Sequence, residues 1–213
     1  VPHVVVREAF VTAATPEENI DSPASWLQDG RRMLVATAKA TDALVVYDGD
    51  TGRRLRTVGG PGTAPGRLQR PNGVATIDDR YLFVVERDNR RVQMFRLPEF
   101  TPLLVFGAAE LQQPYGLWVR ASGDGYEVLV SDAYMAGEDA NGDDIVPPLD
   151  QLDRRFRRYQ VARDGDGWSA RAAGAFGDTS AAGAIRVPES LFGDPAHDRL
   201  LVAEEDEIGR AHV

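Results

Sequence analysis

A run of acidic residues near the end of the chain is the first feature with a clear chemical use. The segment Leu200-Leu201-Val202-Ala203 leads directly into Glu204-Glu205-Asp206-Glu207. Four consecutive carboxylates repel one another, so a run held at the end of a strand needs divalent cations or arginines beside it. Glu189 lies at the head of the preceding apolar stretch. If the two stretches are neighbouring antiparallel strands, Glu189 and Glu205 converge on one cation site; the alternative is a solvated loop after a strand.

A second acidic segment has the spacing of a calcium-binding loop. With Asp139 as position one, Asn141 and Asp143 fall at positions three and five, and Asp150 falls at position twelve. An EF-type loop uses oxygen ligands at these positions but needs glycine at position six, where this chain has Asp144. We interpret the segment as an acidic surface loop, with a weak second metal site at Asp139, Asn141 and Asp143 as the alternative.

Composition limits the class of protein and its partners. The chain has 213 residues with 24 basic and 33 acidic side chains, which gives a net charge of −9. This length is enough for one well-buried domain, and no run of about 18 apolar residues predicts a membrane span. The negative charge argues against sequence-independent binding to nucleic acid or anionic lipid and favours cations. Cysteine is absent, which excludes disulfides and thiolate metal sites.

Other constellations are weak. The segment from Arg154 to Tyr159 is rich in arginine, but alternate residues of a strand point to opposite faces, so a solvated strand face is a better interpretation than a nucleic-acid site. His3, His197 and His212 do not have the spacing of a zinc site. The chain has no Gly-Lys-Ser/Thr phosphate loop and no Gly-x-Ser-x-Gly nucleophile elbow.

Short strands must position the acidic residues, since no segment carries a sustained helical period. Apolar, β-branched runs alternate with turns rich in Gly, Asp, Asn and Pro along the chain. Asn72-Gly73 recurs as Tyr115-Gly116, and Val46-Tyr47 recurs as Met94-Phe95, at intervals of 43 and 48 residues. Four short strands per repeat of about 40 to 50 residues are typical of a β-propeller blade.

We therefore predict an all-β fold, a β-propeller of four-stranded antiparallel blades. The chain holds about three and a half repeats, whereas propellers close with about four to eight blades, so we expect residues 1–207 to be part of a propeller of about six blades. Residues 208–213 interrupt the strand pattern, and we predict that they are a non-native tail. The chain begins at Val1 without the charged and apolar regions of a signal peptide, so we expect that a leader has been removed or that the chain is a fragment.

Two families resemble these repeats. The segments from Val58 to Ala75 and from Val85 to Phe95 are similar to the NHL-type propeller repeat, which indicates a fold and not a chemistry. The more specific resemblance is to the β-propeller phytases (3-phytase-like), which are calcium-dependent phosphohydrolases of inositol phosphates. Four segments carry it: Asp21-Ser22-Pro23-Ala24-Ser25-Trp26-Leu27 resembles the motif D-D-P-A-x-W-L, Thr37-Ala38-Lys39 resembles T-N-K, Tyr115-Gly116 resembles Y-G-F, and Leu201 to Glu207 resembles Y-I-A-E-E-D-E.

This resemblance implies a shallow acidic cleft at one end of the propeller. Carboxylates there hold several Ca²⁺ ions, which bridge to substrate phosphates and activate the attacking water. It implies that Glu205 and Glu189 are catalytic residues, with Glu205 holding the water. It also implies metal ligands and phosphate contacts: the ligands are Asp21, Glu189, Glu205 and Tyr115, and the phosphate contacts are Lys39, Arg87 and Tyr115.

Each of these residues also has a plainer interpretation. Lys39 is the only lysine of the chain, which gives its match independent weight, but a lysine at a strand end is common on surfaces. Tyr115 is otherwise an aromatic that packs between blades, and Asp21 before Ser-Pro is otherwise a turn cap.

The chain also departs from the family pattern. Ser22 replaces the second Asp of the first motif. Ser131-Asp132-Ala133-Tyr134 stands where the family has a second phosphate-binding lysine followed by glutamate. The family draws its remaining calcium ligands from later blades than this chain contains, so the site in this fragment is expected to be incomplete.

Taken together, the sequence predicts a secreted or periplasmic, monomeric hydrolase with no nucleic-acid or membrane partner. Its predicted activity is Ca²⁺-dependent hydrolysis of phosphomonoesters, with phytate or related inositol phosphates as substrates. The main alternative is a non-catalytic, NHL-like propeller that binds a protein or glycan. A weaker alternative is a lactonase-like propeller with a single central Ca²⁺, which would not need clustered acids at one strand end.

Overall fold

The computed structural model describes residues 4–205, which form an all-β protein. Three four-stranded antiparallel sheets follow one another along the chain, and a two-stranded antiparallel pair comes after them. This arrangement confirms the predicted propeller of four-stranded blades, with three complete sheets and half of a fourth among the described residues. The proposed non-native tail, Asp206 and Glu207 lie outside the described residues.

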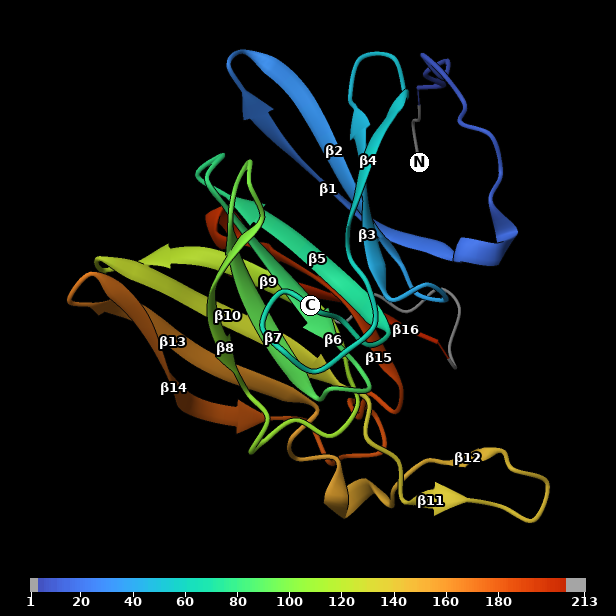
Figure 1. Ribbon diagram of the computed structural model, residues 1–213. Coiled ribbons are helices and arrows are strands. Elements are labelled where there is room, and N and C mark those ends of the chain that lie inside the picture. Colours follow the sequence, from blue (N-terminus) through green and yellow to red (C-terminus); the bar gives the residue numbers. More distant parts are fainter. Residues whose placement is uncertain (1–3, 206–213) are drawn as a thin grey trace.

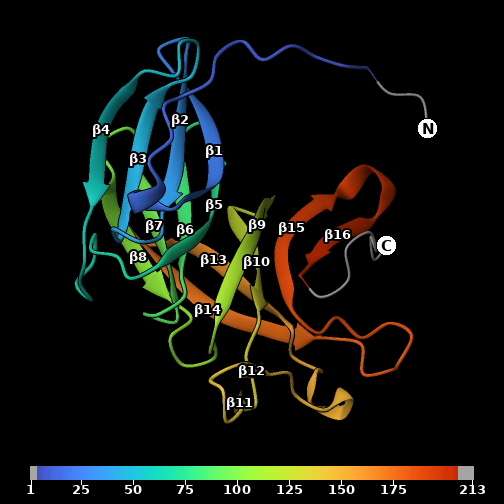
Figure 2. The same cartoon turned by 90° about the vertical axis from the view of Figure 1, so that its right-hand side faces the viewer.

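Each sheet is a meander in which the strands pair in sequence order. Sheet 1 contains β1 (Ile20–Gln28), β2 (Arg31–Ala38), β3 (Ala43–Asp48) and β4 (Arg54–Gly59); sheet 2 contains β5 (Pro71–Ile77), β6 (Tyr81–Glu86), β7 (Arg91–Arg96) and β8 (Thr101–Phe106). Sheet 3 contains β9 (Pro114–Ser122), β10 (Gly125–Asp132), β13 (Phe156–Asp164) and β14 (Gly167–Phe176); sheet 4 contains β15 (Pro188–Asp194) and β16 (Arg199–Glu204). Figures 1 and 2 show the sheets fanned like blades, with β1, β5, β9 and β15 on the inner side.

Within residues 4–205, helical structure is limited to three short 3₁₀ turns, η1 (Pro16–Glu18), η2 (Leu149–Gln151) and η3 (Pro195–His197). This part of the chain contains no helix long and apolar enough to cross a membrane.

Apolar side chains between the sheets hold the blades together. Every residue of β6 is buried, because both faces of sheet 2 are covered. Neighbours along a strand point to opposite faces, so Leu82 and Val84 pack toward sheet 1, whereas Phe83 and Val85 pack toward sheet 3. A smaller cluster joins sheets 3 and 4 and contains Leu129, Phe156, Ile185, Leu191 and Val202.

The four sheets share one register, which identifies equivalent residues. First and second strands pair at Ile20 and Ala38 in sheet 1, Pro71 and Glu86 in sheet 2, Pro114 and Asp132 in sheet 3, and Pro188 and Glu204 in sheet 4. The next residue of each second strand donates its backbone N–H to the matching carbonyl: Lys39 to Asn19, Arg87 to Arg70, Ala133 to Gln113, and Glu205 to Val187. Since these strands are antiparallel, all of these residues lie at one end of the propeller, which we call the top end.

The inner strands approach one another closely at the top end, and glycine makes this possible. A Cβ atom on Gly73 of β5 would lie 2.7 Å from the carbonyl oxygen of Tyr115 in β9. A Cβ atom on Gly116 of β9 would likewise collide with the carbonyl oxygen of Glu189 in β15. Larger residues at these positions would push the sheets apart, so the inner strands bring their first residues together.

The insertion between β10 and β13 forms a small hairpin at the top end. Its strands are β11 (Gly137–Glu138) and β12 (Asp144–Ile145), and the hairpin projects away from the sheets (Figure 1). The segment after it contains only the turn η2, so no helix follows the acidic residues as it does in an EF-hand.

Candidate functional site

Two sets of equivalent residues meet at the top end of the propeller. The inner positions are the residues that follow each paired first-strand residue: Asp21, Asn72, Tyr115 and Glu189. The second positions are the residues that follow each paired second-strand residue: Lys39, Arg87, Ala133 and Glu205. Every site residue that the sequence predicted outside the acidic insertion belongs to one of these two sets.

Lys39 joins sheet 1 to sheet 3 at this end. Its Nζ lies 2.6 Å from Asp21 Oδ2 and donates a hydrogen bond of 3.4 Å to the hydroxyl of Tyr115. The ammonium group also lies 5.5 Å from the centre of the Tyr115 ring, within range of a cation–π interaction. The Lys39 side chain is only 15% exposed, so these contacts hold its charge in a partly desolvated place.

The surroundings fix the protonation states of Lys39 and Tyr115. Burial disfavours the charged form of Lys39, but the hydrogen bond to Asp21 and the neighbouring charges outweigh it, and the pKa of Lys39 is raised. Burial is the main cause that raises the pKa of Tyr115; Lys39 opposes it, and the carboxylates of Glu189 and Asp21 add to it. At neutral pH the pair is therefore an ammonium and a protonated phenol, which can both donate to an anion.

Glu189 is positioned by a contact between sheets 3 and 4. The hydroxyl of Ser131 in β10 donates to the carbonyl oxygen of Glu189 at 2.6 Å and accepts from the backbone N–H of Gly116 at 2.8 Å. β15 and β16 are paired antiparallel, as the sequence analysis expected for the segments that carry Glu189 and Glu205. Both glutamates thus lie at the top end of one hairpin.

The acidic run contains two kinds of position. Glu204 of sheet 4 is equivalent to Glu86 of sheet 2 and Asp132 of sheet 3. In these three sheets the carboxylate accepts a backbone N–H from the segment that leads into the inner strand: Glu204 from Arg186 at 2.5 Å, Glu86 from Gln69 at 3.0 Å, and Asp132 from Gln112 and Gln113 at 3.2 and 2.8 Å. We call this the latch position. Glu205, the next residue, is an exposed second position. The four acids were predicted as one cluster, but the register assigns Glu204 a structural contact and leaves Glu205 at the surface.

Arg87 lies at the second position of sheet 2, in the turn between β6 and β7, and is partly exposed. The second positions therefore carry a lysine, an arginine, an alanine and a glutamate in succession around the top end. Among these residues, Lys39 has a described contact with an inner position of another sheet, the hydrogen bond to Tyr115 of sheet 3. Ala133 occupies the second position of sheet 3, so this position supplies no cation.

The described residues do not by themselves fit a calcium ion. Ca²⁺ takes about six to eight oxygen ligands. Within residues 4–205, no three or more His, Cys, Asp or Glu side chains form a group that could hold a metal. At Asp21, the Lys39 ammonium stands where a cation would bind. The calcium site predicted at Asp21, Tyr115, Glu189 and Glu205 remains a prediction, while the pair of Lys39 and Tyr115 is suited to an anion.

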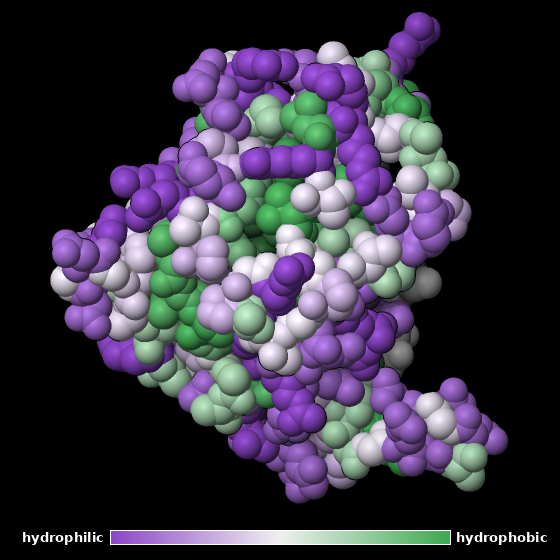
Figure 3. Space-filling view, viewed as in Figure 1, coloured by the Kyte–Doolittle hydropathy of each residue, from purple (hydrophilic) through white to green (hydrophobic). Residues whose placement is uncertain are grey.

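The acidic hairpin uses its first carboxylate on its own backbone. Asp139 Oδ1 accepts the N–H groups of Asn141 and Asp143 at 2.8 and 3.0 Å, and these bonds lower the pKa of Asp139. Figure 3 shows the hairpin as a largely hydrophilic protrusion. The geometry is that of a turn that closes a short hairpin, and the weak metal site at Asp139, Asn141 and Asp143 is still only a prediction.

Sequence reasoning missed Asn72, the inner position of sheet 2. Its side chain is fully buried, and neither Oδ1 nor Nδ2 has a hydrogen-bond partner among the described residues. The two residues that follow each inner position line a cavity of about 200 Å³. They are Ser22, Pro23, Gly73, Val74, Gly116, Leu117, Ser190 and Leu191. The recurrence of Asn72-Gly73 as Tyr115-Gly116 was the available signal, since it aligns Asn72 with a predicted site residue.

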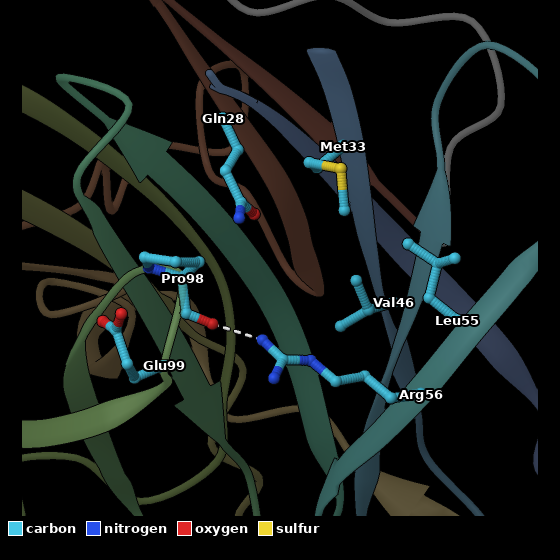
Figure 4. A pocket seen from close by; sticks show the side chains of 7 residues that line it. All are labelled: Gln28, Met33, Val46, Leu55, Arg56, Pro98 and Glu99. Atoms are coloured by element: carbon cyan, nitrogen blue, oxygen red, sulfur yellow. Dashed lines mark hydrogen bonds between the residues drawn. The ribbon is translucent and has the colours of Figure 1, made fainter. Parts of the chain in front are cut away.

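The apolar hollow between sheets 1 and 2 is a separate feature. It has a volume of about 290 Å³ and is lined by Gln28, Met33, Val46, Leu55, Arg56, Pro98 and Glu99 (Figure 4). Arg56 donates to the carbonyl oxygen of Pro98 across it. Gln28 is at the opposite end of β1 from Asp21, so this hollow does not belong to the site at the top end.

No family model and no curated protein matches this chain. Among solved structures, it is similar to Kuenenia stuttgartiensis hydrazine synthase, with 12% identity and a TM-score of 0.47 over 91% of this chain and 58% of that chain. It is also similar to a GH43 β-1,3-galactosidase with galactodeoxynojirimycin, with 10% identity and a TM-score of 0.46 over 84% and 65% of the two chains. It is similar as well to a functionally unknown protein from Desulfotomaculum acetoxidans, with 13% identity and a TM-score of 0.46 over 88% of this chain and 63% of that chain. The chain thus spans less than two thirds of the length of each.

Proposed function

We propose that the top end of this propeller binds phosphate esters and that the protein is a phosphomonoester hydrolase acting on phytate or related inositol phosphates. The observation that carries the proposal is the position of the only lysine of the chain. Lys39 is held by Asp21 of its own sheet and by Tyr115 of sheet 3, with its charge kept and partly desolvated. A desolvated ammonium beside a protonated phenol is a good partner for a phosphate dianion.

The proposed roles follow from the two sets of positions. Lys39 and Arg87 would bind oxygens of the phosphate, and the hydroxyl of Tyr115 would donate to a third. Glu205 is the exposed carboxylate among the second positions, and it would accept the proton of the attacking water. The water oxygen then bonds to phosphorus as the ester P–O bond breaks, and the departing alkoxide takes up the proton that Glu205 accepted, which yields an alcohol of the inositol and orthophosphate and restores the Glu205 carboxylate.

Calcium is part of the proposal on the strength of the sequence resemblance. Ca²⁺ would add charge that stabilises the phosphate, and Asp21 and Glu189, whose charges act on Tyr115, are carboxylates that could contribute ligands. Any such site needs further oxygen ligands beyond those that residues 4–205 bring together. A secreted or periplasmic, monomeric protein would suit this use of calcium.

The test is phosphate release from phytate by the purified protein, with added calcium and with a chelator. Chelator-sensitive release that Glu205→Gln abolishes is the expected result. Release that is unaffected by the chelator would remove calcium from the proposal and keep the hydrolase. Absence of release in both conditions would overturn the hydrolase.

A non-catalytic propeller that binds a protein or glycan is the second candidate. Two observations favour it. Ala133, which carries no charge, occupies the second position of sheet 3, and among residues 4–205 no three or more His, Cys, Asp or Glu side chains form a group that could hold a metal ion. In that case Glu205→Gln leaves partner binding intact, whereas Lys39→Met weakens it if the partner is anionic.

A further inference from the structure

Asn72 is an inner position whose side-chain amide forms no hydrogen bond with the described residues. The other three inner positions, Asp21, Tyr115 and Glu189, carry ionisable side chains that are only partly buried. Asn72 is fully buried, and its amide oxygen and amide nitrogen both lack a partner in the described part of the chain. A buried amide left without hydrogen bonds destabilises the folded state, so an apolar residue would be the more stable choice if packing were its only task.

The position of Asn72 ties it to the candidate site. β5 lies between β1 and β9 on the inner side of the fan (Figure 2). Gly73, the next residue, packs against the backbone of Tyr115 and Gly116 and lines the cavity that begins below the inner positions. Arg87 follows the strand that pairs with β5, and Lys39 follows the strand that pairs with β1. Asn72 therefore lies in the sector of the top end that carries both candidate phosphate-binding cations.

We propose that Asn72 is a ligand-binding residue of the top end, held without a protein partner so that its amide can bind one group that both donates and accepts a hydrogen bond. A metal ion would use only Oδ1, and a fully ionised phosphate oxygen would use only Nδ2. A hydroxyl group, or the P–OH of a protonated phosphate, satisfies both atoms. The proposal rests on the proposed function for its ligand class, a phosphorylated polyol.

Full burial of Asn72 has a consequence for the binding step. The ligand reaches the amide only when it displaces the side chains that cover it, so binding includes a local rearrangement at the top end. Because the amide is unpaired, its removal is expected to leave the stability unchanged or to raise it, and at the same time to weaken ligand binding. These opposite signs separate a binding residue from a residue with hidden structural partners, including a buried water.

The experiment compares Asn72→Ala with a matched variant, Asn89→Ala. Asn89 lies in the same sheet near the same end, but its Nδ2 donates to Glu86 Oε2 at 2.5 Å and to the carbonyl oxygen of Gly62 at 3.0 Å. Thermal unfolding is measured for both variants. Binding of orthophosphate and of myo-inositol monophosphate is measured by calorimetry on the same proteins.

The expected result is that Asn72→Ala has an unchanged or higher Tm and binds about tenfold more weakly, whereas Asn89→Ala has a lower Tm and near-normal affinity. Weaker binding of both probes assigns the contact to the protonated phosphate, and weaker binding of the inositol phosphate alone assigns it to a hydroxyl. A lower Tm for Asn72→Ala, or an unchanged affinity, overturns the proposal. If the wild-type protein binds neither probe, the proposed function and the binding role of Asn72 both fail, whereas an unchanged affinity of Asn72→Ala overturns the role of Asn72 alone.

Discussion

The latch position and the second position are adjacent in sequence but differ in environment. In sheet 2 the latch residue Glu86 is fully buried and accepts hydrogen bonds from Gln69, Asn89, Arg91 and Gln93. The next residue, Arg87, is partly exposed; its backbone N–H donates to the carbonyl oxygen of Arg70, and its carbonyl oxygen accepts from the N–H of Arg90. Sheets 3 and 4 keep an acid at the latch position, whereas the second position changes its charge from sheet to sheet. The latch position maintains the blade, and the second position is free to take part in binding.

The largest expected effect is on the free energy of unfolding, when Glu86 at the latch position of sheet 2 is replaced. Glu86→Ala leaves Arg91, which is 9% exposed and bonded to Glu86 at 2.6 Å, without its carboxylate in the interior. Breaking a buried ion pair by removing one partner costs about 3–5 kcal/mol. Urea unfolding measures this loss. A loss below about 1 kcal/mol would contradict the structural role of the latch position.

The next effect concerns binding and not stability. Lys39→Met is expected to weaken phosphate binding about 10- to 100-fold, since one hydrogen bond to a charged group contributes about 1.5–3 kcal/mol. Arg32→Met is the matched control, because it removes one exposed positive charge from the opposite end of the same strand. Titration with orthophosphate should separate the two variants. Equal affinities would remove Lys39 from the site.

The acidic run itself allows the most direct comparison. Glu204→Gln is expected to lower the free energy of unfolding by about 1–2 kcal/mol, because the hydrogen bond from the Arg186 N–H is charge-assisted. Glu205→Gln is expected to change it by less than about 0.5 kcal/mol, since Glu205 is exposed. Both are measured by denaturant unfolding. The reverse order would show that the register assigns the two glutamates wrongly.

The smallest effect is a pH dependence in sheet 1, where the latch position is Ala38 and carries no carboxylate. There Glu18 accepts two hydrogen bonds of 2.8 Å from Arg54, and the hydrogen bond to Arg54 is the main cause that lowers the pKa of Glu18. A lowered pKa contributes stability that is complete above the unfolded pKa of about 4.3 and is lost as the pH falls through the folded pKa. Arg54 is 41% exposed, so we expect about 0.5–1 kcal/mol.

The measurement for this pair compares wild type and Glu18→Gln in denaturant unfolding at several pH values. Wild type should be the more stable protein at neutral pH, and the two curves should converge in acid. A constant difference at all pH values would show that the ionised form of Glu18 has no special role.

The repeat in the sequence predicted more than the fold. Val46-Tyr47 and Met94-Phe95 were matched by pattern, and in both sheets the third strand shifts its register against the fourth between these two residues. Asn72-Gly73 and Tyr115-Gly116 are likewise equivalent in the register. Periodicity found these matches because each blade repeats the same alternation of buried and exposed residues.

Other parts of the site could not be predicted from the chain alone. The separate environments of Glu204 and Glu205 depend on hydrogen bonds to a segment that leads into another strand, and local sequence shows only four similar acids. The ion pair of Lys39 with Asp21 depends on the pairing of β1 with β2. In sequence, Asn72 precedes Gly73, which is a common pair in turns. That its amide has no hydrogen-bond partner among the described residues is visible only when the surrounding sheets are in place.

The single lysine at the top end gives the site a chemical label of its own. Amine-reactive reagents attack only the unprotonated amine, and apart from the α-amino group Lys39 is the only amine of the chain. The ion pair with Asp21 keeps this amine protonated, so its acylation should be slow in the free protein. The rate of this acylation would therefore report on events at the junction of sheets 1 and 3, without any engineered cysteine.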